Sequence, residues 1–327
     1  MQNRGLLLLL FVGAGSIGYL FLGSQPDLFG QQAPRSLELI RPKEYPLKLD
    51  KELGVPAARL EEGRLHQVAV TLVEIPPGGK LEPHRHLAEE FVYIVSGKGY
   101  TTMWNGSEAE KKRYGWTEGD LLSPTLNAWH QHVNVSPDTP ARYLSVTTAP
   151  LSEKLFKNHV FLYSNDFRFE EFWEWSLIQK PQYVGSKGTE MLAGHLLPDL
   201  SNRELREGNP GLRGISIGHP RGMAGNRLLG MEVRELSTAN AITTSHRKLW
   251  DSVYYILKGD GSIVVEREGE SERRLDWTEG DLFFVEAYDY GQFHARGGPG
   301  GRWLQMNTSG YFRELGLDKY GIQNKVK

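Results

Sequence analysis

The sequence predicts an all-β protein made of two related lobes in tandem, preceded by a short apolar segment. Short runs rich in Val, Ile, Tyr and Phe alternate with Gly, Pro, Asn or Asp about every eight to twelve residues, which is typical of a β-sandwich or barrel. Examples of the expected strands are 67–75, 91–95, 100–104 and 141–147, and Asn105-Gly106 predicts a hairpin turn.

An internal repeat indicates the duplication. The segment 116–121, Trp-Thr-Glu-Gly-Asp-Leu, recurs unchanged at 277–282, an offset of 161 residues. Segments 93–99 and 255–261 share Tyr-Ile at their start and Gly-x-Gly at their end, 162 residues apart. Two copies of one β-domain therefore follow each other in nearly constant register.

These landmarks divide the chain into a first lobe at 51–150, a connector at 151–206 and a second lobe at 207–327. Residues 27–50 are expected to form a tether. Large apolar side chains in the connector predict that it is buried against both lobes. They are Leu155, Phe156, Phe167, Phe169, Phe172 and Trp173.

Residues 1–26 differ from the rest of the chain. After Arg4, the 22 positions 5–26 carry no charge, and at about 1.5 Å per helical residue they are long enough to cross a membrane. We expect an uncleaved transmembrane anchor, with a cleaved secretory signal as the alternative, since no convincing small-x-small cleavage site follows. Arg4 favours a cytoplasmic N-terminus, so the body would be extracytoplasmic, either periplasmic or extracellular, or else secreted.

Composition excludes several classes of function. A formal net charge of -2 over 327 residues leaves no basic excess for neutralising phosphates, which argues against nucleic acid as a partner. The absence of cysteine excludes disulfides, zinc-thiolate sites, iron-sulfur clusters and a cysteine nucleophile. A bound metal must therefore have nitrogen and oxygen ligands.

Such ligands cluster in the first lobe as His84, His86, Glu90 and His130. Strand residues two or four apart face the same side, so the first three can point together while His130 comes from a later strand. Three imidazoles and one carboxylate leave coordination positions open for a substrate, as in catalytic sites. The sequence predicts one divalent transition metal, Fe2+ in the first place, with Mn2+ and Zn2+ as alternatives.

The spacing of these residues resembles the two motifs of the cupin superfamily almost position for position. The matching positions are Gly78, His84, His86, Glu90 and Gly97, followed by Gly119, His130 and Asn134. The resemblance implies a jelly-roll β-barrel for each lobe, with the metal in the first. Thr125 and Asn127 stand where the family usually has proline and glycine, although Asn tolerates the left-handed turn expected there.

Three further side chains in this region are candidates for the site. His132, two residues beyond His130, should face the same side, so it is assigned a catalytic role beside the metal. Trp104 and Trp129 are candidate substrate-binding residues, with simple packing as the alternative.

The second copy lacks the ligand set. His246 matches His84, but Lys248 and Ser252 stand where the first copy has a histidine and a glutamate. A protonated lysine repels a metal ion. His294 lies three residues late relative to His130, which implies an inserted loop. We therefore expect the second lobe to be a degenerate scaffold or interface.

A narrower likeness concerns activity. The run 127–132 and the layout with one degenerate lobe resemble the gentisate and hydroxynaphthoate ring-cleaving dioxygenases. This implies a non-haem Fe(II) dioxygenase for an aromatic or small organic acid, although those enzymes typically use three histidines and this chain also has Glu90. The alternatives are a Mn(II) or Zn(II) decarboxylase or isomerase of a small acid or sugar, and a non-catalytic membrane-tethered binding module. A homo-oligomer is compatible with each.

Overall fold

The computed structural model describes residues 37–61, 64–175, 182–184, 191–207, 211–217, 226–296, 300–317 and 322–324. These residues belong to one unit that begins at Leu37. The predicted anchor or signal segment at 1–26 lies outside them. Across the described parts of the chain, no helix is both long and apolar enough to span a membrane.

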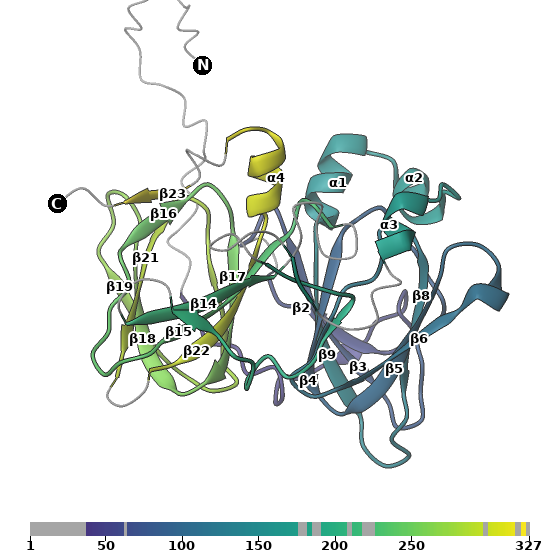
Figure 1. Ribbon diagram of the computed structural model, residues 1–327, viewed down its shortest axis with the longest axis horizontal. Coiled ribbons are helices and arrows are strands. Elements are labelled where there is room, and N and C mark those ends of the chain that lie inside the picture. Colours follow the sequence, from purple (N-terminus) through teal and green to yellow (C-terminus); the bar gives the residue numbers. More distant parts are fainter. Residues whose placement is uncertain are drawn as a thin grey trace, which may run out of the picture. The chain divides into compact units, whose positions relative to one another are not determined.

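Two sheets form the first lobe (Figure 1). Its strands are β1 (Lys48–Leu49), β2 (Pro56–Arg59), β3 (Ala69–Ile75), β4 (Glu90–Ser96), β5 (Lys98–Trp104), β6 (Lys112–Thr117), β7 (Leu121–Leu122), β8 (Trp129–Asn134), β9 (Ala141–Thr147) and β12 (Leu196–Leu197). The larger sheet has the order β1-β2-β3-β9-β4-β7-β12, and the smaller has β6-β5-β8. Val92 of the larger sheet and Met103 and Trp116 of the smaller belong to one buried cluster, so the sheets enclose a common core.

The second lobe repeats this plan. Its strands are β10 (Gln182–Val184), β11 (Met191–Ala193), β13 (Arg206–Glu207), β14 (Leu212–Ile217), β15 (Gly230–Leu236), β16 (His246–Lys248), β17 (Ser252–Lys258), β18 (Asp260–Glu266), β19 (Arg273–Thr278), β20 (Leu282–Val285), β21 (Tyr290–Ala295), β22 (Arg302–Asn307) and β23 (Ile322–Asn324). Over the described residues, one sheet has the order β10-β11-β14-β15-β22-β17-β20 with β13 beside β14, and the other has β19-β18-β21-β16-β23. The chain is thus mostly β, as predicted.

Helices are short and few among the described residues: α1 (Ala149–Phe156), α2 (His159–Ser164), α3 (Glu170–Trp175), α4 (Ser309–Glu314) and a 3₁₀ turn, η1 (Glu108–Glu110). The first three gather at one end of the first lobe (Figure 1). The predicted burial of the connector is wrong for Leu155, Phe156 and Phe167, which are 62%, 51% and 62% exposed. The rings of the two phenylalanines contact other connector rings instead, Phe156 with Phe161 at 5.0 Å and Phe167 with Phe169 at 4.8 Å between centroids.

The β5–β6 hairpin is closed by a longer connection than the two-residue turn expected at Asn105-Gly106. Met103 pairs with Lys112, and residues 105–111, including η1, join the two strands. Ser107 caps η1 by accepting the backbone N–H of Ala109 at 3.2 Å.

The repeated hexapeptide makes the same tight turn in both lobes. Asp120 Oδ2 accepts the backbone N–H of Thr117 at 2.8 Å, and Asp281 Oδ2 accepts that of Thr278 at 2.7 Å. The glycine inside each turn has a φ of +87° or +86°, where other residues are strained. Each turn needs both an aspartate and a glycine, so the motif has a local structural cause.

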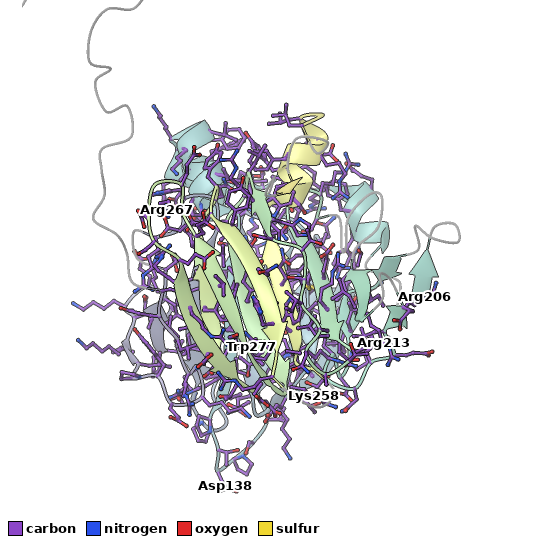
Figure 2. The ribbon with its side chains drawn as sticks, turned by 90° about the vertical axis from the view of Figure 1, so that its left-hand side faces the viewer. Asp138, Arg206, Arg213, Lys258, Arg267 and Trp277 are labelled. Carbon is purple, nitrogen blue, oxygen red and sulfur yellow. The ribbon has the colours of Figure 1, made fainter. Side chains whose placement is uncertain are left out.

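The tryptophan of each repeat explains the Gly-x-Gly turn. A Cβ at Gly99 would lie 2.3 Å from the Trp116 ring, and one at Gly261 would lie 2.4 Å from the Trp277 ring. Trp277 is 1% exposed and lies inside the second lobe (Figure 2). Only glycine lets the backbone approach these rings so closely.

Strand β4 is buried on both faces. Val92 and Ile94 pack inside the first lobe, whereas Phe91 and Tyr93 join a core shared with the second lobe. The Tyr93 ring meets Tyr255, its counterpart in the repeat, at a centroid distance of 4.7 Å. Successive side chains of β4 therefore serve the barrel interior and the lobe junction alternately.

Two buried carboxylates join the lobes in a matching way. Glu89 accepts the backbone N–H groups of residues 227–229, just before β15, at 2.6, 2.8 and 2.8 Å. Asp251 accepts those of His66 and Gln67, just before β3, at 2.7 and 3.0 Å. Each carboxylate thus holds the chain that enters the other lobe.

The lobes also exchange short arms. Ile40, which precedes the first lobe, pairs with Leu282 of β20 in the second lobe. Leu197 of β12, which precedes the second lobe, pairs with Leu121 of β7 in the first. This reciprocal pairing and the two carboxylates make the duplicated lobes one continuous packing unit.

Candidate metal centre

Two segments bring the histidines together: the one before β4, which contains His84 and His86, and strand β8, which contains His130. His84 and His130 exchange both backbone hydrogen bonds, at 3.0 and 2.9 Å, so the segment before β4 lies against β8. Asn127 enters β8 with a φ of +55°, which confirms the expected left-handed turn. Its backbone N–H donates to the carbonyl of His86 at 3.1 Å.

The side chains of all four predicted ligands meet inside the first lobe. The ligand nitrogens of His84, His86 and His130 lie within 4.8 Å of one another. Glu90 Oε2 lies 3.3 Å from His86 Nε2 and 3.5 Å from His130 Nε2. Glu90 is the first residue of β4 and faces the barrel interior, whereas Glu89 faces the lobe junction, as strand alternation predicts.

Backbone carbonyls orient the three imidazoles. The Nδ1–H groups of His84, His86 and His130 each donate to a carbonyl oxygen two residues away in the chain, at 2.9, 2.7 and 3.0 Å. A neutral imidazole with its proton on Nδ1 has its lone pair on Nε2. The three rings are therefore fixed in the tautomer that binds a metal through Nε2.

The residues fit a divalent transition metal. Glu90 Oε2 and His130 Nε2 are buried and accept no hydrogen bond from the described residues. The other oxygen, Glu90 Oε1, accepts the hydroxyl of Ser145. Buried polar atoms without partners are costly, and a cation among three nitrogens and one oxygen would satisfy them together.

The protonation states also suit a cation. Burial, followed by the neighbouring His130 and His86, lowers the pKa of His84 well below its usual value. Burial opposes ionisation of Glu90, but its contacts with His130 and His86 still hold its pKa well below the usual range. At neutral pH the site therefore presents a carboxylate and a neutral His84, the forms that bind metals. Burial opposes the charged form of His86, but the hydrogen bond and charge of Glu90 raise its pKa, so a bound metal would displace a proton from this ring.

His132 lies beside the four ligands and differs from them in its hydrogen bonding. Its Nδ1 lies 2.7 Å from Thr101 Oγ1, which already accepts the indole N–H of Trp116 at 3.0 Å. In the tautomer in which the Thr101 hydroxyl donates to Nδ1, the His132 proton is on Nε2. Burial, followed by His130, lowers the pKa of His132 to about 3. His132 is therefore a neutral imidazole beside the metal ligands, and its own ligand atom lies within 4.8 Å of those of Glu90 and His130.

Sequence reasoning missed Thr101, Ser145 and Tyr143. Ser145 and Tyr143 belong to the predicted strand 141–147, and the His132 ring lies 5.0 Å from that of Tyr143. Alternation groups these two side chains on one face. Only the pairing of β9 with β4 decides that this face is the one with Glu90.

Trp104 and Trp129 do not join the cluster. They are cross-strand partners in β5 and β8, and their rings stack at 6.1 Å with planes 9° apart. Because Trp129 is adjacent to His130 in a regular strand, it faces the other side of the sheet. Arg85 covers it at 4.8 Å. Neither tryptophan is therefore assigned to the metal site.

Strand register identifies what replaces each ligand in the second lobe. His246 pairs with Gly291 as His84 pairs with His130, so Gly291 occupies the position of the last ligand. The inserted loop expected from His294 is wrong, because β18 and β21 pair without a shift. His294 corresponds to the residue after His132, on the other face of its strand.

The other replacements follow the sequence alignment. Lys248 lies in β16 and Ser252 begins β17, as Glu90 begins β4. In the described part of the chain, the His, Asp and Glu groups close enough to share a metal ion all lie in the first lobe.

Comparisons with known proteins agree with this architecture. Residues 71–147 match the cupin domain family. Salicylate 1,2-dioxygenase from Pseudoaminobacter salicylatoxidans, solved with gentisate, has a TM-score of 0.62 at 17% identity, over 87% of this chain and 80% of that one. A mutant of the Bacillus subtilis oxalate decarboxylase has a TM-score of 0.54 at 13% identity, over 85% of this chain and 78% of that one. The sequence matches no curated protein at a significant level.

Proposed function

We propose that this chain, whose residues 71–147 match the cupin domain family, is a mononuclear metal enzyme, specifically a non-haem Fe(II) dioxygenase acting on an aromatic or small organic acid. The observation that carries the proposal is that the ligand atoms of His84, His86 and His130 lie within 4.8 Å of one another, with Glu90 Oε2 3.3 and 3.5 Å from Nε2 of His86 and His130. The metal would be held by His84, His86, Glu90 and His130. Four protein ligands leave room for two more in an octahedral sphere.

The surroundings of the four ligands favour an oxygenase. Met103, His132, Tyr143 and Ser145 are the neighbours on the inner strands β5, β8 and β9, and none is charged. Burial, followed by the charge of Glu90, raises the pKa of Tyr143 well above its usual value, so it stays a phenol. A decarboxylase would call for a second carboxylate or an arginine at this place, to handle a proton or a second charge.

Each side chain has a task in such a reaction. Bound iron would supply redox chemistry and a positive charge for the substrate's oxygen atoms. His132 Nε2–H can donate a hydrogen bond to an anionic substrate oxygen and hold its orientation. The buried wall of Met103 and Tyr143 excludes water from the reacting atoms.

Aromatic hydroxy acids are the first substrates to test. The salicylate dioxygenase supports them through its fold, and its structure was solved with gentisate. At 17% identity that similarity concerns the fold, so the substrate class remains our proposal.

The second candidate is a Mn(II) or Zn(II) decarboxylase or isomerase in which the metal acts as a Lewis acid. Glu90 favours it, because a carboxylate oxygen is a ligand that suits Mn(II). The fold similarity to oxalate decarboxylase also supports it.

One experiment separates these candidates. The protein is purified without oxygen, its metal is measured, and oxygen uptake is followed with salicylate, gentisate and oxalate. We expect the Fe(II) form to take up one O2 per aromatic molecule and to give a product heavier by two oxygen atoms. Release of CO2 from oxalate by the Mn(II) form, without net oxygen uptake, would instead support the Lewis-acid enzyme.

We also propose that residues 1–26 anchor this enzyme to a membrane, with the lobes on the extracytoplasmic side. The support is the uncharged stretch after Arg4.

A further inference from the structure

The second lobe contains a cavity of about 620 Å³ in the place where the first lobe has its metal ligands. Gly291 and Ser252 line it, at the positions of His130 and Glu90. Loss of two large side chains leaves space that a packed core would otherwise fill. The volume lies in the usual range for small-molecule sites.

The walls of this cavity are aromatic with a few polar groups. Phe293 and Trp303 stack at 4.2 Å with planes 6° apart, and both line the cavity. Trp250 and Tyr254 add further ring surface, and Gln305 supplies an amide. Such walls suit a ligand with a flat or otherwise apolar body.

Lys248 gives the cavity a positive charge. Its Nζ lies 3.1 Å from the hydroxyl of Tyr254, and both side chains line the cavity. No carboxylate among the described residues forms an ion pair with Lys248. The Lys248 ammonium therefore lies beside a hydroxyl and aromatic side chains, without a carboxylate to balance its charge.

The acidic groups of the cavity are already paired. Glu232 forms an ion pair with Arg234 at 2.8 Å. Glu286 and Asp289 each form an ion pair with Arg267 at 2.8 Å, and Asp289 forms a second one with Arg273 at 3.3 Å. Arg267 lies at the opposite end of the lobe from Lys258 (Figure 2). These pairs neutralise the acidic side chains, so the lysine charge remains to attract an anion.

We propose that the second lobe is a metal-free binding site for a small organic carboxylate with an aromatic or other apolar body. Lys248 Nζ and the Tyr254 hydroxyl hold the carboxylate, and the rings of Phe293 and Trp303 cover the body. The ammonium supplies the positive charge that a metal supplies in the other lobe. This site does not depend on the reaction catalysed in the first lobe.

The test uses the full chain with His84→Ala and His130→Ala, which removes metal-dependent binding from the first lobe. Benzoate, with benzamide as its neutral counterpart, is titrated by calorimetry and by intrinsic tryptophan fluorescence, to which Trp250 and Trp303 in the cavity wall contribute. We expect one benzoate per chain and at least about tenfold weaker binding of benzamide. Absence of benzoate binding, or equal binding of both compounds, would overturn the proposal.

Variants of the second lobe locate the site. Lys248→Met should weaken benzoate binding at least about tenfold, whereas Lys258→Met, at an exposed position, should leave it unchanged. Gly291→Leu should fill the cavity with little backbone strain, because a Cβ there meets its nearest neighbour at 3.7 Å. Unchanged benzoate affinity in the Lys248→Met or the Gly291→Leu protein would show that benzoate binds elsewhere.

Discussion

At the scale of single residues, main-chain carbonyls prepare the site before any ligand arrives. Each ligand histidine donates Nδ1–H to a carbonyl that is close in sequence, so its orientation depends on local backbone. Glu90 is held differently, by Ser145 on the neighbouring strand. The imidazoles are thus oriented by the motif itself, and the carboxylate is oriented by tertiary structure.

The first prediction concerns metal content. We expect one transition-metal ion per chain, and His130→Ala should abolish binding because it removes a ligand from β8. His294→Ala is the matched control, since this residue lies on the other face of the corresponding strand in the second lobe. Elemental analysis after gel filtration measures both, and circular dichroism checks the fold. Two metal ions per chain, or metal retained by His130→Ala, would contradict the assignment.

The second prediction concerns the hydroxyl that holds Glu90. Ser145→Ala should lower the metal affinity about 10- to 100-fold, because the carboxylate loses its fixed orientation. Ser123→Ala is the control: the Ser123 hydroxyl donates at 3.0 Å to the backbone carbonyl of Glu90 and not to its carboxylate. Competition with a chelator measures the affinities. Equal losses in the two variants would mean that general destabilisation, and not the carboxylate contact, is being measured.

At the scale of secondary-structure elements, β4 and its counterpart β17 connect the barrel interiors to the lobe junction. Every residue of β4 from Glu90 to Val95 is buried. The residue before each strand, Glu89 or Asp251, accepts backbone N–H groups of the other lobe. The junction is therefore made of buried hydrogen bonds to carboxyl groups as well as apolar contacts, and burial raises the pKa of Glu89 to about 7.

The third prediction tests this junction. Glu89→Ala should destabilise the protein by about 3–5 kcal/mol, because three backbone N–H groups lose their buried acceptor, whose pKa burial raises to about 7. Asp251→Ala should have a similar effect. Glu279→Ala, at an exposed position, should change the free energy of unfolding by less than about 0.5 kcal/mol. Urea unfolding measures all three, and a loss below about 1 kcal/mol for Glu89→Ala would count against the junction.

The fourth prediction concerns the arm that enters the first lobe. His195 donates Nδ1–H to the carbonyl of Ser123 at 2.8 Å, and burial lowers its pKa from 6.5 to about 4. The unfolded chain therefore binds more protons than the folded one between pH 6.5 and 4. This histidine should make stability fall as the pH is lowered through that window, by up to about 1.4 kcal/mol per pH unit.

Removing the titrating group isolates that contribution. Urea unfolding at several pH values should give a smaller slope for His195→Gln than for the unmodified chain. His159→Gln changes an exposed histidine and should leave the slope as it is. An unchanged slope in His195→Gln would show that His195 keeps its proton balance on folding.

At the scale of the whole molecule, duplication has given two lobes of one plan with different interiors. The first gathers metal ligands, and the second has a cavity with a lysine. Each lobe contributes an arm and a carboxylate acceptor to the other. The second lobe is therefore part of the scaffold that holds Glu90, whatever it binds itself.

The fifth prediction concerns location. Full-length protein should fractionate with membranes, and reporter fusions at the C-terminus should be extracytoplasmic, because the uncharged segment after Arg4 can span a bilayer. Removal of residues 1–26 should release a folded, metal-binding protein. A cytoplasmic reporter, or full-length protein found wholly in the soluble fraction, would refute the anchor.

The sequence by itself determined the β class, the duplication and the four candidate ligands. These features depend on local signals: strand alternation, the turn chemistry of Asp120 and its repeat, and ligand spacing within a motif. Each such signal acts over a few residues, so it can be recognised without knowing how distant strands pair. The left-handed Asn127 was predictable for the same reason.

Tertiary structure alone decided the rest. Strand register showed that Gly291, not His294, replaces His130, because the position of a residue across a sheet depends on its partner strand. The contact of Ser145 with Glu90 and the cavity beside Lys248 likewise arise from pairings between segments far apart in the chain. The connector's exposed rings show the same limit: an apolar side chain favours burial, but only packing decides whether a partner surface reaches it.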